Sequence, residues 1–126
     1  MVSSTTTALA ELGNTVFGGG GQEFAKVDVG AGATVEIVAA VAGSRIRILA
    51  AVFAGVGSNT GVLLQSTPAG SAATDLTGSI TGPQNISIVL PYNPAGWVQT
   101  ASGAAFDVTA VVGSVDGLVV YELVPG

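Results

Sequence analysis

The sequence contains no cysteine and no histidine. Without cysteine, neither a disulfide framework nor a thiolate metal site can form. Without histidine, the chain lacks the side chain that most often acts as acid, base or metal ligand near neutral pH. The Ser-His-Asp and Cys-His arrangements of nucleophilic enzymes are therefore excluded.

Charged residues are scarce. Three basic and eight acidic residues make up 9% of the chain and give a net charge of −5, against roughly 25% charged residues in an ordinary soluble domain. Such a surface has little repulsion to keep neighbouring chains apart. We therefore expect part of it to be covered by other protein chains, the alternative being an uncharged monomeric sandwich. Because Lys26, Arg45 and Arg47 are the whole basic complement, no nucleic acid partner is expected.

Long apolar runs are also missing. The longest, residues 46–56, is interrupted by Arg47, whereas a membrane helix needs about 20 consecutive apolar residues. The first residues, MVSSTTTALAELG, lack a basic segment followed by a continuous apolar one, so no secretory signal peptide is predicted. We expect a soluble protein with no membrane partner.

The sequence changes character near residue 23. Residues 1–23 begin rich in Ser and Thr, continue with a short helix-like patch, and reach four consecutive glycines at 18–21. Four glycines do not hold a regular element at low cost. We predict a flexible, extended N-terminal arm over residues 1–23 and a single domain over residues 24–126.

From residue 24 onward, short segments alternate between apolar and polar residues, as half-buried β-strands do. Val27 and Val29, for example, alternate with Lys26 and Asp28. The predicted strands are 25–29, 34–40, 45–50, 61–66, 74–80, 85–90, 96–101, 105–111 and 118–124. Eight or nine short strands separated by turn residues predict an all-β fold, a single-domain antiparallel β-sandwich of the jelly-roll type.

The last predicted strand, 118–124, is apolar on both faces except at Glu122. Such a strand is either central between two covered faces of its own domain or has an outer face that meets another subunit. The first interpretation is favoured, because long apolar strands are usually buried inside their own domain.

Motifs for catalysis or cofactor binding are not found. Carboxylates that could act as a glycosidase pair are available but sit in no local motif, namely Asp75, Asp107, Asp116 and Glu122. The glycines at 18–21 are followed by Gln22-Glu23-Phe24, not by the Lys and Ser or Thr of a phosphate-binding loop. No calcium loop is present either. We predict no enzyme activity, no cofactor, no metal and no small-molecule substrate.

The most distinctive segment is residues 91–97, Pro-Tyr-Asn-Pro-Ala-Gly-Trp. Its prolines fix φ, and Asn-Pro and Ala-Gly favour turns. Tyr92 and Trp97 are large amphipathic rings that suit an interface anchor or stacking on a sugar. The alternative is that Trp97 plugs one end of the sandwich.

Arg45 and Arg47 form a close basic pair that could dock on an acidic patch of a partner. Alternatively, Arg47 is satisfied within the chain, by Glu36 across a hairpin or by Asp107. The candidate interface residues are Leu9, Leu12, Val16, Phe17, Arg45, Arg47, Tyr92, Asn93, Pro94 and Trp97.

Three runs of the sequence, Gly-Ser-Arg-Ile-Arg-Ile-Leu at 43–49, Val-Leu-Pro-Tyr-Asn-Pro-Ala-Gly-Trp at 89–97, and residues 113–122, carry a family resemblance. Together they resemble the capsid decoration, or cement, proteins of tailed bacteriophages. The resemblance covers about residues 24–124 and is most specific at 90–97. It implies a jelly-roll fold and a homotrimer on the outer surface of the phage head. The implied partner is the major capsid protein, whose subunits the trimer bridges to stabilise the shell.

The resemblance also implies a location in the virion, on the outside of the capsid, after synthesis in the host cytoplasm. Because phages use jelly rolls in head fibres and tails too, a module that binds host-surface glycans through Tyr92 and Trp97 is the second hypothesis. A hydrolase of cell-wall sugars and a secreted adhesin are further alternatives.

Overall fold

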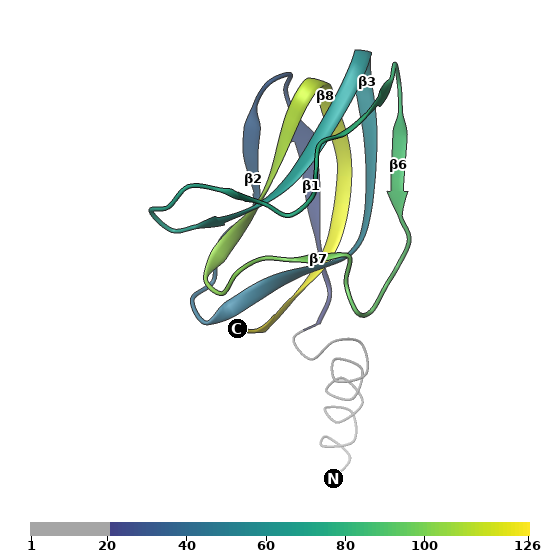
Figure 1. Cartoon of the computed structure of the whole chain (residues 1–126). Helices are drawn as coiled ribbons and strands as arrows, with labels where there is room; N and C mark the ends of the chain where they lie inside the picture. Colours follow the sequence, from purple (N-terminus) through teal and green to yellow (C-terminus); the bar gives the residue numbers. More distant parts are fainter. Residues whose placement is uncertain (1–20) are drawn as a thin grey trace.

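The computed structural model describes residues 21–126, which form an all-β fold (Figure 1). The strands in chain order are β1 (Glu23–Val29), β2 (Thr34–Val38), β3 (Ser44–Pro68), β4 (Thr74–Asp75), β5 (Ile80–Pro83), β6 (Ser87–Leu90), β7 (Val98–Gln99) and β8 (Ala104–Pro125). The described residues include no apolar helix of membrane-spanning length. The predicted all-β class is confirmed.

The centre of the fold is a long antiparallel ribbon of β3 and β8. The two strands pair from Ser44↔Pro125 at one end to Pro68↔Ala104 at the other. Between them, the register jumps from Val56↔Ser114 to Gly61↔Val112. Extra residues inserted into a ladder bend the strands and increase their twist. The ribbon therefore turns a corner at this point, which divides β3 and β8 each into two halves.

Gly113 makes the corner possible. Its φ is +68°, a backbone conformation that residues other than glycine adopt only at an energetic cost. A Cβ at this position would also collide with the backbone oxygen of Asn59. The corner thus depends on the absence of a side chain at residue 113.

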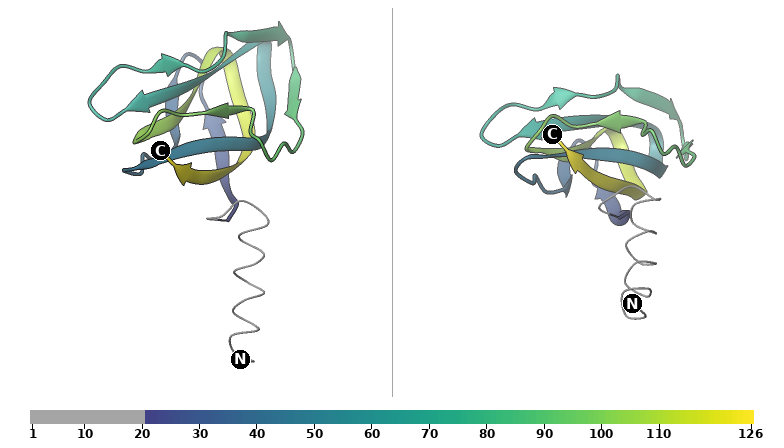
Figure 2. Two further views of the ribbon diagram at one scale, coloured as in Figure 1. Left: turned by 60° about the horizontal axis from the view of Figure 1, so that its bottom comes forward. Right: turned by 90° about the horizontal axis from the view of Figure 1, so that it is seen from below.

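The corner creates two layers. Sheet I has the order β1, C-terminal half of β8, N-terminal half of β3, β6. Sheet II has the order β2, N-terminal half of β8, C-terminal half of β3, β5. The short β4 and β7 extend the pairing along β3. Two four-stranded antiparallel sheets in these orders make a jelly-roll sandwich, which confirms the predicted fold; Figure 2 shows the layers from two further directions.

Several predicted strand boundaries were wrong. Segments 45–50 and 61–66 belong to one strand, β3, and segments 105–111 and 118–124 both belong to β8. The glycines between them bend a paired ladder and do not end it. Predicted strands 74–80 and 96–101 shorten to the two-residue β4 and β7, with residue 80 opening β5.

The core lies between the two sheets. Its largest fully buried side chains include Phe53 of sheet I and Phe106 of sheet II. Val27 and Val29 of β1 are buried, and Lys26 and Asp28 are exposed, as the alternation predicts. Burying each large apolar side chain contributes about 1.5–3 kcal/mol, so this double layer stabilises the sandwich.

Candidate interaction surfaces

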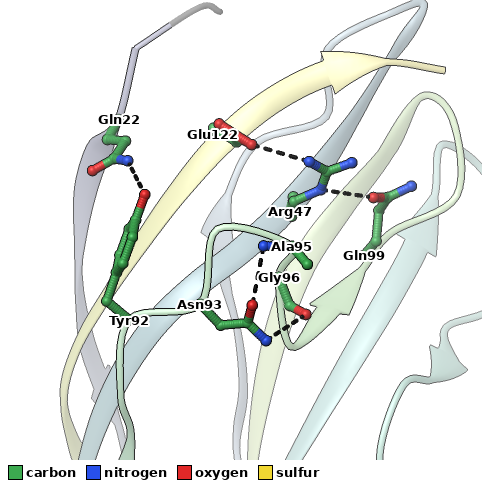
Figure 3. Close-up of polar contacts among 8 residues, drawn as sticks. All are labelled: Gln22, Arg47, Tyr92, Asn93, Ala95, Gly96, Gln99 and Glu122. Atoms are coloured by element: carbon green, nitrogen blue, oxygen red, sulfur yellow. Dashed lines mark hydrogen bonds and ion pairs between the residues drawn. The ribbon is translucent and has the colours of Figure 1, made fainter. Parts of the chain in front are cut away.

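Residues 91–97 form a hydrogen-bonded loop across one end of sheet I. The chain leaves β6 at Leu90 and returns to pair with β3 through β7. Asn93 and Trp97 donate backbone hydrogen bonds to the carbonyls of Leu49 and Ile48, at 2.8 Å each. The Asn93 side chain accepts from the Ala95 N–H at 3.0 Å (Figure 3). The loop is held at both ends and by its own turn, so it presents its side chains rigidly.

Tyr92 links this loop to the first strand. Its hydroxyl accepts a hydrogen bond of 2.8 Å from Gln22 Nε2, immediately before β1 (Figure 3). About half of Tyr92 remains exposed. The ring therefore has a fixed position and a free surface, as an interface anchor requires.

Trp97 lies at the surface. Its indole Nε1 donates to the Pro91 carbonyl at 2.7 Å, and the residue is 43% exposed. The hydrogen bond satisfies the polar end of the ring and fixes its orientation. Trp97 is thus not a buried plug of the sandwich, and it shares the loop with Tyr92.

Arg47 supports the loop from below. Its Nη1 lies 3.2 Å from Glu122 Oε1 and its Nε donates to Gln99 Oε1 at 3.1 Å. A Cβ at Gly96 would collide with the Arg47 side chain, so the loop packs directly on the arginine stem. Arg45 makes a longer contact, with its Nη1 3.5 Å from the Thr100 carbonyl oxygen.

The predicted pairing of Arg47 with Glu36 or Asp107 is wrong. The pairing with Glu36 required β2 and β3 to form a hairpin, whereas β2 pairs with β8. Glu36 consequently lies opposite Asp107, and Arg47 lies opposite Glu122. Strands β2 and β3 follow one another in the chain but are not adjacent in a sheet, because the jelly-roll order places β8 between them.

The structure brings part of the predicted interface together. Four of its residues, Arg47, Tyr92, Asn93 and Trp97, gather at the loop end of sheet I, with Pro94 in the same exposed turn and Arg45 two residues along β3. The candidates Leu9, Leu12, Val16 and Phe17, and most of the predicted arm, lie outside the described residues. Whether these residues bind a partner stays a prediction.

Sequence reasoning missed a second surface, the outward side of sheet I. We call it the apolar face and define it by Phe24, Val52, Val89 and Leu118 from its four strands. Their exposures are 77%, 38%, 63% and 43%. The signal was present in the sequence: residues 118–124 are apolar on both faces, and the outer one was assigned to the protein's own core. Leu118 instead faces outward.

The outward side of sheet II has the opposite character. We call it the polar face and define it by Thr34, Glu36, Gln65, Thr67, Asp107 and Thr109. Its side chains bond to one another: Thr34 and Thr109 hydroxyls at 2.6 Å, and Thr109 to Gln65 Oε1 at 2.8 Å. Thr67 donates to Asp107 Oδ2 at 2.6 Å. A polar surface with several internal hydrogen bonds of this kind suits contact with water.

Pockets and groups of metal-binding side chains are both absent from residues 21–126. No pocket opens among them, and they contain no cluster of three acidic side chains placed to hold a metal ion. One titrating group is shifted in this range: burial, together with the neighbouring Glu23 carboxylate, raises the pKa of Tyr121. These two residues lie opposite one another between β1 and β8.

The chain matches no protein-family model and no curated protein. Among solved structures, it is similar to a chain described as "Structure of infectious bursal disease virus Gx strain", with 10% sequence identity and a TM-score of 0.30. The match covers 83% of this chain and 41% of that chain, so this chain spans less than half the length of its structural neighbour.

Proposed function

We propose that this protein is a non-enzymatic capsid decoration protein of a tailed bacteriophage. In this role it binds the outer surface of the head as a homotrimer and stabilises the shell by bridging subunits of the major capsid protein. The observation that carries the proposal is a jelly roll whose sheet I combines an exposed apolar face with a clamped aromatic loop.

A decoration protein needs a stiff body and contact surfaces, and no reacting groups. The ribbon of β3 and β8 runs through both sheets, so force on one layer passes to the other along covalent strands. The polar face is already hydrogen-bonded within itself, which leaves sheet I to make contacts. Several modest contacts per trimer then act together through effective concentration.

Binding to capsids tests this proposal. Purified protein is mixed with empty capsids of the phage that encodes it, and co-sedimentation is measured against capsids of an unrelated phage. We expect saturable binding to the cognate capsids and a higher temperature of shell disruption. Protein that stays in the supernatant at all concentrations would refute the proposed role.

A glycan-binding module in a head fibre or tail is the second candidate. The observation in its favour is the pair of half-exposed rings, Tyr92 and Trp97, on one rigid loop. Aromatic faces of this kind can stack on sugar rings. A glycan array probed with the intact protein decides between the two: specific binding removed by Trp97→Ala favours recognition, whereas capsid binding without glycan binding favours decoration.

A further inference from the structure

We propose that the apolar face of sheet I is the surface through which copies of this chain associate. The inference goes beyond the proposed function: the contact is reciprocal between two copies, as in a two-fold pair, and is separate from the contacts within the proposed homotrimer. Neighbouring strands align the residues concerned: Lys26 lies opposite Leu118, Leu118 opposite Val52, and Val52 opposite Val89. Three apolar side chains and one lysine thus form a row across the whole sheet.

The exposure of the apolar side chains in this row indicates that a partner covers them. In an antiparallel sandwich, the strand face turned to water is normally polar, and the outward side of sheet II follows that rule except at Val111, which is 41% exposed. The outward side of sheet I differs, because Val52, Val89 and Leu118 are apolar and exposed, as is Phe24 beside them. Because both faces belong to one molecule, the general lack of charge in the sequence does not explain the difference.

Charges beside the row are left without partners. Asp28 and Asp116 lie directly opposite one another, two residues along the strands from Lys26 and Leu118. Like charges in this arrangement destabilise a sheet. Within residues 21–126, neither these two carboxylates nor the Lys26 ammonium makes an ion pair or a hydrogen bond.

A second copy of the chain fits this combination. The face of a second copy supplies an apolar row for the apolar row, a lysine for the Asp28–Asp116 pair, and that acidic pair for Lys26. A shift of two residues along a strand is about 7 Å and packed sheets lie about 10 Å apart, a separation that a lysine side chain and a facing aspartate side chain bridge together. A purely basic partner would pair with the two aspartates but not with Lys26, and a purely acidic partner would pair with Lys26 alone.

Sedimentation velocity of the full chain over a range of concentrations tests the proposal without any capsid. We expect the wild type to associate in pairs as its concentration rises and the double variant V52E/L118E to lose this step, because two charges then face the apolar row. Val41 is 40% exposed in the loop between β2 and β3, so V41E is the matched control and associates like the wild type. Thermal melts by circular dichroism confirm that each variant is folded.

Charge reversal adds a test that loss of folding cannot mimic. K26E copies carry three acidic groups on this part of the face and D28K/D116K copies carry three basic ones, so each variant alone is expected not to pair through this face. A mixture of the two restores every opposite-charge contact and is expected to associate. Failure of the mixture to associate, or association of V52E/L118E at wild-type strength, overturns the inference.

The outcomes separate this inference from the proposed function. A chain that associates through the apolar face yet ignores capsids keeps the inference and refutes capsid decoration. A wild-type chain that is monomeric at all concentrations refutes the inference, and binding of that monomer to capsids would assign the apolar face to the shell. A monomer whose apolar face is covered by its own residues 1–20 also refutes it.

Discussion

Arg47 of β3 and Glu122 of β8 form an ion pair of 3.2 Å directly across the central ribbon, beneath the 91–97 loop. The Glu122 side chain is 4% exposed, whereas that of Arg47 is 29% exposed. Burial of a carboxylate carries a desolvation cost, which the paired arginine offsets. The pair therefore joins the two long strands and supports the loop that carries Tyr92 and Trp97.

Removal of the arginine is expected to destabilise the fold. Arg47→Met retains most of the apolar stem but leaves Glu122 buried and unpaired, and we expect a loss of about 3 kcal/mol in the free energy of unfolding. Urea denaturation measures it. Arg45→Met is the control, because Arg45 makes one contact of 3.5 Å; equal losses in the two variants would contradict a special role for the ion pair.

Replacement of Glu36 by lysine is expected to stabilise the protein. Glu36 lies opposite Asp107 in the β2–β8 ladder, and Asp107 Oδ1 is buried without a hydrogen-bond partner in the described structure. Glu36→Lys converts a repulsive pair into an attractive one, for a gain of about 0.5–1 kcal/mol. Chemical denaturation at low salt checks this, and Glu36→Gln is expected to give a smaller gain. Because salt screens exposed charges, a gain that persists undiminished at high salt would count against the electrostatic explanation.

Gly113→Ala is expected to weaken the corner between the sheets. The positive φ and the collision with the Asn59 backbone oxygen together predict a loss of about 2 kcal/mol or more. Gly30→Ala is the matched control, since a Cβ there meets nothing within 4 Å. Similar melting temperatures for the two variants would show that the corner tolerates a side chain.

The raised pKa of Tyr121 predicts that the protein loses stability at alkaline pH. Burial and the Glu23 carboxylate raise its pKa in the folded state above the unfolded value of about 10. The resulting stabilisation is complete below pH about 10 and is lost as the pH rises through the folded-state pKa. Tyr121→Phe removes this component, so its free energy of unfolding should fall less steeply between neutral and strongly alkaline pH. Parallel curves for the variant and the wild type would assign the alkaline loss to other groups.

Trp97→Ala is expected to weaken capsid binding by about 30-fold, the effect of losing a typical anchor of about 2 kcal/mol. Trp97→Phe keeps a ring but loses the hydrogen bond to Pro91, so an intermediate effect is expected. Co-sedimentation with capsids measures both. Wild-type affinity for Trp97→Ala would remove Trp97 from the interface.

The local pattern of the sequence was sufficient for the fold class. Successive side chains of a strand point to opposite faces, so alternation places Val27 and Val29 in the core and Lys26 and Asp28 at the surface. This result does not depend on which strand lies beside them. Turn chemistry likewise placed the 91–97 loop correctly between two strands. Such properties depend on residues close in the chain, which is why they can be read from it.

Which strands become neighbours is decided only by the tertiary structure. Arg47 pairs with Glu122, 75 residues away, and not with Glu36, because the jelly-roll order places β8 between β2 and β3. The glycines near residues 57 and 113 look like turns in the sequence, yet they bend two strands that stay paired. By itself, the sequence determined that Leu118 and Val52 are apolar and that Leu118 lies on a strand, whereas Val52 fell just beyond the predicted strand 45–50. Their meeting in one exposed row follows from long-range register, which local pattern does not encode.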